Sequence, residues 1–94
     1  MFDKMKQLQQ MKEQMDAAKE RLNHISVKGE CQGITVVANG NKKILEVSIP
    51  DGMDKEELAE LIVIATNKAI ENAESVFESE MRGMAGGLMG GLGF

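Results

Sequence analysis

The side chains best able to do chemistry in this chain are cations and amides within its first 24 residues. Lysine and arginine can hold phosphate oxygens, and glutamine can hydrogen-bond to the edge of a nucleic-acid base. Acidic side chains in the same segment offset these cations, so an ordinary solvated surface is the competing interpretation. The cations are Lys4, Lys6, Lys12, Lys19 and Arg21, and the amides are Gln7, Gln9, Gln10 and Gln14. Lys42 and Lys43 form a second candidate phosphate contact further along the chain.

No other group of residues suggests catalysis, a metal site or a cofactor. The single histidine, His24, and the single cysteine, Cys31, stand in no nucleophile–base or metal-ligand pattern. The methionines of the first helix are more typical of flexible packing than of a copper site, since no cysteine or histidine cluster accompanies them. The sequence therefore predicts a protein that is not an enzyme, needs no cofactor and has no small-molecule substrate.

The cations must be positioned by a helix, because the apolar residues among them are spaced as in a heptad repeat. Leu8, Met11, Met15, Ala18, Leu22 and Ile25 are separated alternately by three and four residues. This predicts a helix over residues 1–24. Its apolar stripe is too narrow for an ordinary core helix, so we expect it to pack against another helix.

Three short segments after this helix have the pattern of β-strands. Apolar and polar residues alternate from Ile25, and residues 34–38 are rich in β-branched side chains. A third strand follows over residues 44–49, with Leu45 and Val47 expected on one face, and Pro50 ends it. Gly29 and Gly33 are expected to bracket an irregular piece. Asn39 and Gly40 predict a hairpin turn, which Asn41 and Lys42 would lengthen.

A second helix is predicted from Asp54 to about Met81, with Asp54 and Glu57 resembling a capping box. Its apolar residues occupy more than one face, whereas a three-stranded sheet covers only one, so the surplus face suggests a second copy of the chain. Asn67 is expected to fix helix register or bond across that interface. The residues predicted for the core or dimer contact are Leu58, Leu61, Ile62, Ile64, Ala65, Asn67 and Ala69.

Charge is unevenly distributed along the 94 residues. The net charge is −4, which argues against a bulk electrostatic binder of nucleic acid. Residues 1–50 contain eight basic and six acidic side chains, whereas residues 51–94 contain three basic and nine acidic ones. Any anionic partner is therefore expected to meet the first half. The lone cysteine and the lack of a signal or membrane-spanning pattern predict a cytoplasmic protein with no membrane partner.

Three segments together resemble the YbaB/EbfC family of small bacterial nucleoid-associated DNA-binding proteins. They are residues 33–40, residues 45–49 and residues 57–69. Within the last segment, residues 65–69 read Ala-Thr-Asn-Lys-Ala, where the family tends to show Ala-x-Asn-x-Ala. The methionine- and glutamine-rich first helix and the glycine-rich end complete the family's layout over nearly the whole chain.

The resemblance implies an α+β fold of helix, three-stranded antiparallel sheet and helix (αβββα), forming a tweezer-like homodimer. Residues 1–24 would be a projecting helix, residues 25–82 the dimerisation core, and residues 83–94 a flexible glycine- and methionine-rich tail. The implied partner is double-stranded DNA in the nucleoid, with a role in nucleoid organisation or gene regulation. Because no base-reading module is recognisable, contacts are expected to be mainly to the DNA backbone. The alternative is a dimeric protein-interaction adaptor that uses the first-helix seam and a methionine-rich surface.

Overall fold

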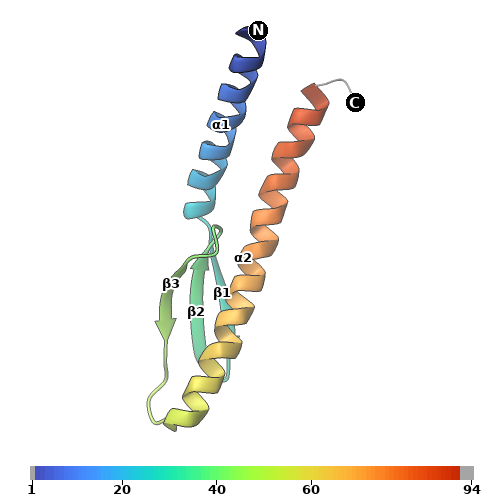
Figure 1. Ribbon diagram of the computed structural model, residues 1–94. Coiled ribbons are helices and arrows are strands. Elements are labelled where there is room, and N and C mark those ends of the chain that lie inside the picture. Colours follow the sequence, from blue (N-terminus) through green and yellow to red (C-terminus); the bar gives the residue numbers. More distant parts are fainter. Residues whose placement is uncertain (1, 92–94) are drawn as a thin grey trace.

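The chain folds as helix, three strands and helix, which confirms the predicted αβββα order (Figure 1). The computed structural model describes the backbone of residues 2–91 and the side chains of residues 3–84. The elements are α1 (Phe2–Asn23), β1 (Ser26–Cys31), β2 (Ile34–Asn39), β3 (Ile44–Ser48) and α2 (Lys55–Gly91). The molecule is elongated, with extents of 64 × 21 × 17 Å.

The hydrophobic core lies between α2 and the first two strands of the sheet. The strands are antiparallel in the order β1-β2-β3, and Val27, Gly29 and Cys31 pair with Ala38, Val36 and Ile34. Residues paired across antiparallel strands share a face, so all six face α2. On this face Ile34, Val36 and Ala38 are fully buried against the helix residues Leu61, Ala65, Ala69 and Ala73.

Gly29 is where α2 and the sheet come closest together. A Cβ atom at this position would overlap the Ala65 carbonyl oxygen and the Ala69 amide nitrogen, and would lie 3.0 Å from Ala69 Cα. The predicted irregular piece between Gly29 and Gly33 is therefore wrong in extent, because β1 continues through Gly29 to Cys31. Only Gln32 and Gly33, both with positive φ, form the turn into β2.

The hairpin between β2 and β3 is longer than a two-residue turn, as the sequence allowed. Lys42, with φ of 67°, is the non-glycine residue of this loop in the left-handed region. The Asn39 side-chain oxygen accepts hydrogen bonds from the backbone amides of Asn41 and Lys43, at 2.9 and 3.1 Å. These bonds hold the loop in one shape, as is usual for an asparagine at the start of a turn.

A β-bulge in β3 changes the predicted alternation of this strand. Val47 pairs with Val36 and Glu46 with Val37, but Ala38 pairs with Ile44, so Leu45 is the extra residue. Ile44 and Val47 consequently lie on the α2 side of the sheet, whereas the sequence placed them on opposite faces. Every residue of β3 is nevertheless exposed, because α2 lies over β1 and β2.

The second helix begins where the sequence predicted and ends later. The Asp54 carbonyl oxygen accepts a hydrogen bond from the Leu58 amide at 2.8 Å, which makes Asp54 the N-cap. The helix then continues through Gly91, past the predicted boundary at Gly83. Glycine weakens a helix by about 1 kcal/mol relative to alanine but, unlike proline, keeps its amide donor. Residues 92–94 of the predicted tail lie outside the described residues.

Candidate functional site

Two helices extend beyond the sheet and form the part of the molecule that carries the candidate cations. α1 leaves the hairpin end of the sheet, and the second half of α2 runs alongside it in the opposite chain direction (Figure 1). Among the described side chains of α1, residues 3–23, only Ala18 and Leu22 are buried, both near the sheet. Toward the N-terminal end of α1, Leu8 is 65% exposed and Met11 is 44% exposed. The apolar stripe of the helix therefore has no packing partner there.

The lysines of α1 are accessible along its whole length. Lys4, Lys6, Lys12 and Lys19 are all exposed. Within the described part of the chain, no carboxylate lies within ion-pair distance of any of the four. An exposed lysine without an intramolecular partner can bind an anion without first breaking an ion pair. The structure therefore leaves these four side chains available, and their contact with phosphates stays a prediction.

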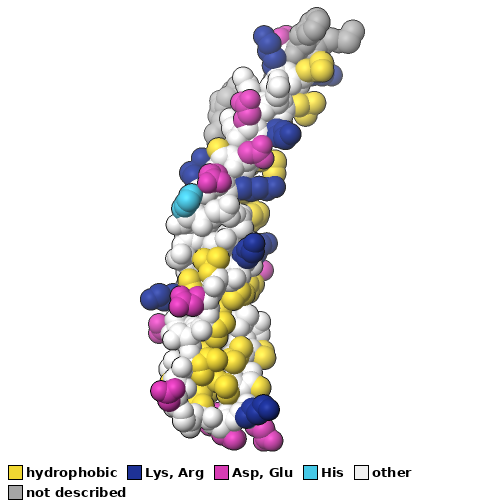
Figure 2. All heavy atoms as spheres, turned by 90° about the vertical axis from the view of Figure 1, so that its left-hand side faces the viewer, with side chains coloured by type: hydrophobic (Ala, Val, Ile, Leu, Met, Phe, Trp, Pro, Cys, Tyr) yellow, Lys and Arg dark blue, Asp and Glu magenta, His cyan; other side chains and the backbone are white. Residues whose placement is uncertain are grey.

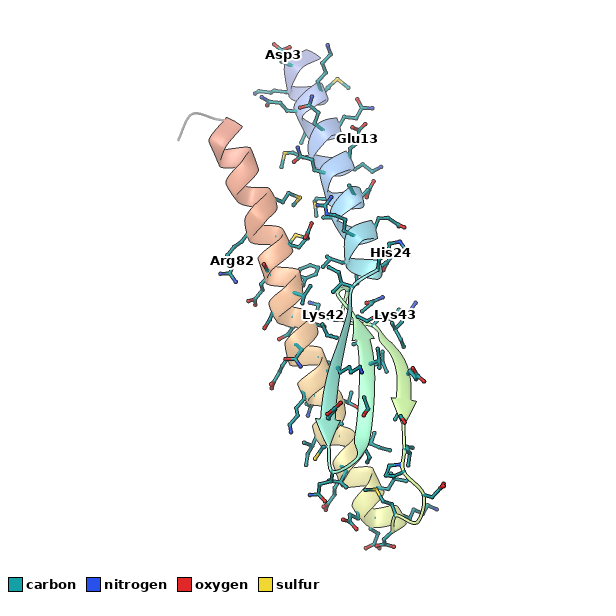
Figure 3. All side chains as sticks on the ribbon, turned by 180° about the vertical axis from the view of Figure 1, so that it is seen from behind. Asp3, Glu13, His24, Lys42, Lys43 and Arg82 are labelled. Carbon is teal, nitrogen blue, oxygen red and sulfur yellow. The ribbon has the colours of Figure 1, made fainter. Side chains whose placement is uncertain are left out.

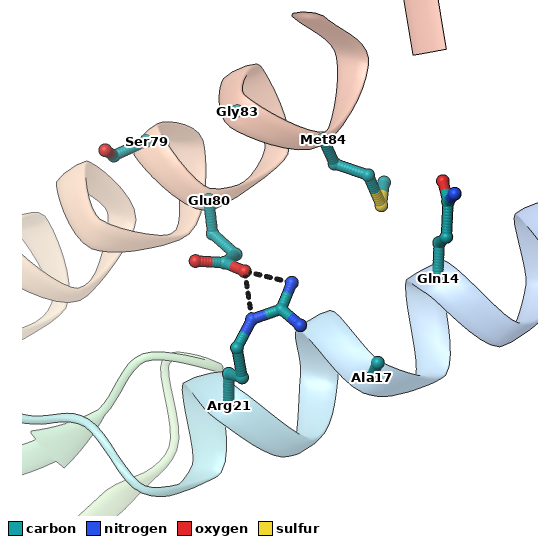
Figure 4. Close-up of a pocket in the computed structure, with 7 residues that line it drawn as sticks. All are labelled: Gln14, Ala17, Arg21, Ser79, Glu80, Gly83 and Met84. Carbon is teal, nitrogen blue, oxygen red and sulfur yellow. Dashed lines mark hydrogen bonds and ion pairs between the residues drawn. The ribbon is translucent and has the colours of Figure 1, made fainter. Parts of the chain in front are cut away.

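Arg21 differs from the lysines because it is already paired. Its Nε donates to Glu80 Oε1 at 2.6 Å, and its Nη2 contacts the same oxygen (Figure 4). The pair links the last turn of α1 to α2 at the edge of a groove of about 420 Å³ between the helices. The groove is lined by Gln14, Ala17, Arg21, Ser79, Glu80, Gly83 and Met84. In this geometry Arg21 positions one helix against the other, and its predicted phosphate contact would require Glu80 to be displaced.

The two loop lysines also differ from each other. Lys42 Nζ lies 4.6 Å from the centre of the Phe77 ring, in a cation–π contact with α2. Lys43 is exposed and points away from α2 (Figure 3). Lys42 therefore helps to dock the loop on α2, whereas Lys43 is the loop cation that remains accessible.

The hairpin loop also fixes the base of α1. Asn41 Nδ2 donates to the Lys19 carbonyl oxygen at 3.0 Å and to Asn23 Oδ1 at 2.6 Å, and the Gly40 amide donates to the Leu22 carbonyl oxygen at 2.9 Å. The bond to Leu22 supplies a partner to one of the last four carbonyl groups of α1, which have none within the helix. His24 pairs instead with Glu20 Oε1 at 3.2 Å. The loop therefore sets the direction in which α1 leaves the sheet.

The residues predicted for the core or dimer contact divide into two groups. Leu61, Ala65 and Ala69 are buried, and Leu58 and Ile62 are partly buried against the core. Ile64 and Asn67 are exposed, so neither contributes to the core of the single chain. Their part in a dimer remains a prediction.

A second apolar surface lies beside the core, which we call the apolar flank. Lys68 Nζ and Asn72 Nδ2 donate to the Glu30 and Lys28 carbonyl oxygens, so one side of α2 lies along β1. Val63 and Ile70 are half a helical turn away, on the β3 side. Figure 2 shows hydrophobic side chains gathered over the sheet when the molecule is viewed from the β3 side. The apolar flank consists of Ile44, Val47, Val63 and Ile70, of which Val63 is 58% exposed.

The described residues contain no cluster of side chains suited to a metal ion. Within that part of the chain no three histidine, cysteine or acidic side chains lie close enough to hold a metal ion. Cys31 is a half-buried strand residue with a free thiol. None of the helices in the described residues has the length and hydropathy needed to cross a membrane.

The sequence missed Glu80 and Phe77 as determinants of the site. Both lie on α2, and each meets a candidate cation that is distant in the sequence. The cause is the length of α2, which brings its second half alongside α1. No local pattern around Glu80 or Phe77 predicts such a contact.

Comparison with known proteins gives a consistent result. Residues 1–88 match the model of a family described as the YbaB/EbfC DNA-binding family. A nucleoid-associated protein of Thermoanaerobacter pseudethanolicus is 38% identical over 89 residues, which cover 88% of this chain and 80% of the relative. Nucleoid-associated proteins of Chlorobium phaeobacteroides and Chlorobaculum tepidum are each 37% identical over 91 residues, covering 93% of this chain and 82% of each relative.

Proposed function

Because this chain belongs to the YbaB/EbfC DNA-binding family, we propose that it binds double-stranded DNA as a homodimer, mainly through the DNA backbone. Its place would be the nucleoid, where it would organise DNA or regulate genes. The family is one of DNA-binding proteins and not of enzymes. The relatives are named nucleoid-associated proteins, which does not favour the adaptor interpretation.

The observation that carries this proposal is the row of exposed lysines on α1. They project from a protein of net charge −4, so the attraction for DNA is local and does not come from overall charge. Helix α1 has 22 residues, which at about 1.5 Å per residue give about 33 Å, close to one turn of duplex DNA.

The described residues include no structure typical of base recognition. The sheet separates the two helices, so they do not form a helix-turn-helix. The described residues also contain no metal-binding cluster of the kind that a zinc finger needs. Backbone contacts position a protein on a duplex but carry little sequence information. We therefore expect weak sequence preference, with any selectivity arising from DNA shape.

The apolar flank supports the homodimer. Ile44 and Val47 face the α2 side of the sheet, yet the chain's own α2 leaves them exposed. Val63 and Ile70 lie on the side of α2 that is directed toward β3. Exposed apolar residues grouped in this way are typical of a protein interface. A second copy of the chain would cover β3 with an equivalent surface, in the isologous contact of a two-fold dimer.

The experiment that tests the proposal is light scattering of the protein alone and with a duplex of about 30 base pairs. We expect the protein alone to have twice the mass of the chain. Adding the duplex at low salt should give a complex that contains at least one dimer per duplex. A protein with the mass of one chain, or a duplex that stays free in excess protein, would contradict the proposal.

A further inference from the structure

Methionine is concentrated in the two helices that extend beyond the sheet. Seven of the eight methionines precede residue 16 or follow residue 80, and Met53 is the exception. Residues 2–15 belong to α1 and residues 81–89 to the second half of α2, and these two stretches run side by side (Figure 1). Methionine is therefore the main apolar residue available where the two helices meet.

Four of these methionines lie at the contact between the helices. Met11 and Met15 precede the buried Ala18 by seven and three residues, so they share the side of α1 that faces α2. Met84 lines the groove between the helices (Figure 4). Met81 precedes Met84 by three residues on the same side of α2 and is likewise half-buried. We call Met11, Met15, Met81 and Met84 the methionine seam.

The first half of α1 depends on this packing. Within the described part of the chain, the hydrogen bonds and ion pairs that join α1 to other elements come from residues 19–23. Residues 3–15 therefore rely on apolar contact with α2. A helix shorter than about 12–15 residues is marginal in water by itself. Loss of the packing would let this half of α1 separate from α2 and fray.

The methionine seam is also accessible to small molecules. Met11 and Met15 are each 44% exposed. The groove beside Met84 has a volume of about 420 Å³, far more than a water or peroxide molecule needs. A small reagent can therefore reach the sulfur atoms on which the contact between the helices depends.

We propose that the methionine seam is an oxidation site, at which peroxide releases the first half of α1 from α2. At each methionine the thioether sulfur attacks one oxygen of hydrogen peroxide. A sulfur–oxygen bond forms as the oxygen–oxygen bond breaks, so the sulfur is oxidised by two electrons and the peroxide is reduced. The departing hydroxide takes the proton of the transferred oxygen and leaves as water. The product, methionine sulfoxide, is polar and disrupts packing among methionines.

Only part of α1 is expected to respond. The Arg21–Glu80 pair and the bonds from the hairpin loop to residues 19–23 involve no methionine, so the base of the helix stays in place. Methionine sulfoxide reductases convert the sulfoxide back to the thioether, so the release is reversible. It does not require DNA, and the oxidation site is independent of the proposed function.

The test measures amide hydrogen exchange before and after treatment with hydrogen peroxide, in protein that carries Cys31→Ala so that the thiol cannot contribute. We expect exchange in residues 3–15 to rise about 10-fold, because a half-buried apolar side chain contributes roughly the free energy of a tenfold change in an equilibrium. Exchange in residues 61–73, at the core of α2, should not change. Mass spectrometry of peptides gives the oxidation of each methionine. Unchanged exchange in residues 3–15 after full oxidation of the seam would overturn the inference.

Two variants locate the effect. The first replaces the whole seam, with Met11→Leu, Met15→Leu, Met81→Leu and Met84→Leu, which removes the thioethers at little cost in packing. Its exchange should not respond to peroxide. The control is Met5→Leu with Met53→Leu, because Met5 is 70% exposed on the side of α1 away from α2 and Met53 packs against the core. The control should respond like the unsubstituted protein, and an equal response of both variants would show that the seam is not the site.

A measurement on the unaltered protein covers the case in which a variant misfolds. Oxidised wild-type protein is treated with methionine sulfoxide reductase, and mass and hydrogen exchange are measured again. We expect both the masses of the seam peptides and the exchange of residues 3–15 to return to their starting values. Fast exchange that persists after the masses return would show that the sulfoxides are not its cause. Sulfoxides that the reductase cannot reach would contradict a released α1.

Discussion

Replacing Gly29 with alanine is expected to lower the stability of the protein by about 3 kcal/mol, the largest effect we predict for any single methyl group. The added Cβ would overlap the Ala65 carbonyl oxygen and the Ala69 amide nitrogen. Both are backbone atoms in the middle of α2, so no side-chain rotation relieves the overlap. The helix would have to move away from β1, which would open the core around Val36 and Ala65. For a domain of this size the melting temperature should fall by about 15 °C.

The matched control for this substitution is Gly83→Ala. Gly83 also lies in α2, but a Cβ there has no neighbour within 4 Å. Because alanine favours a helix more than glycine does, this control should raise stability by up to about 1 kcal/mol. Thermal unfolding by circular dichroism at one fixed protein concentration compares the two, since the proposed dimer would make the melting temperature depend on concentration. A Gly29→Ala protein that melts within 3 °C or so of wild type would show that the helix and sheet are not in this close contact.

Replacing Val63 with glutamate is expected to convert the proposed dimer to monomers and to weaken DNA binding by about 100-fold. Val63 belongs to the apolar flank and is 58% exposed, so the single chain tolerates a charge there. In the proposed dimer the same position is covered, and burying an unpaired carboxylate is costly. Two linked binding surfaces gain about 10²-fold or more over one, and the monomer loses this advantage.

Ser75→Glu is the control, since it adds the same charge to an exposed position of α2 outside the apolar flank. It should remain a dimer and keep most of its affinity, apart from a small general effect of the added negative charge. Light scattering gives the mass, and fluorescence anisotropy with a labelled duplex gives the affinity. If the Val63→Glu protein keeps the mass of a dimer, the apolar flank is not the interface. If it becomes monomeric yet binds DNA as tightly as wild type, dimerisation is not needed for binding.

The element order followed from the sequence because each element has a clear period. The heptad spacing of Leu8, Met11 and Met15 predicted α1, and the alternation in the strands predicted the sheet. The cap at Asp54 was also predicted, because capping depends on a few adjacent residues. These signals are local, so one sequence is sufficient to recognise them.

The departures from prediction have causes that are not local. From the sequence alone, Gly29 predicts an interruption of the strand. In the structure it lies within β1, where the lack of a side chain lets the backbone of α2 lie directly against the strand. The bulge at Leu45 depends on the hairpin, in which the Asn39 side chain fixes the position of Lys43. Glycines in residues 83–91 predicted an early end of α2, but the helix continues there.

The arrangement of the candidate cations could not be predicted from the sequence, and their role in binding stays a prediction. All of the candidate cations are exposed, as their charge requires. What the sequence did not reveal is that Arg21 pairs with Glu80 and Lys42 lies over Phe77. Both contacts depend on the second half of α2 passing the base of α1, a consequence of tertiary structure. They separate the cations that position the helices from those that remain available to a ligand.

The most direct test of DNA binding through the backbone is a salt titration of affinity for a duplex of mixed sequence. If a dimer makes at least four phosphate contacts, log affinity should fall with log salt at a slope of about −3.6 or steeper. Affinity would then drop by about 10²-fold or more between 50 and 200 mM salt, with little dependence on duplex sequence. An affinity that stays constant over this range, or one that depends mainly on sequence, would contradict the account.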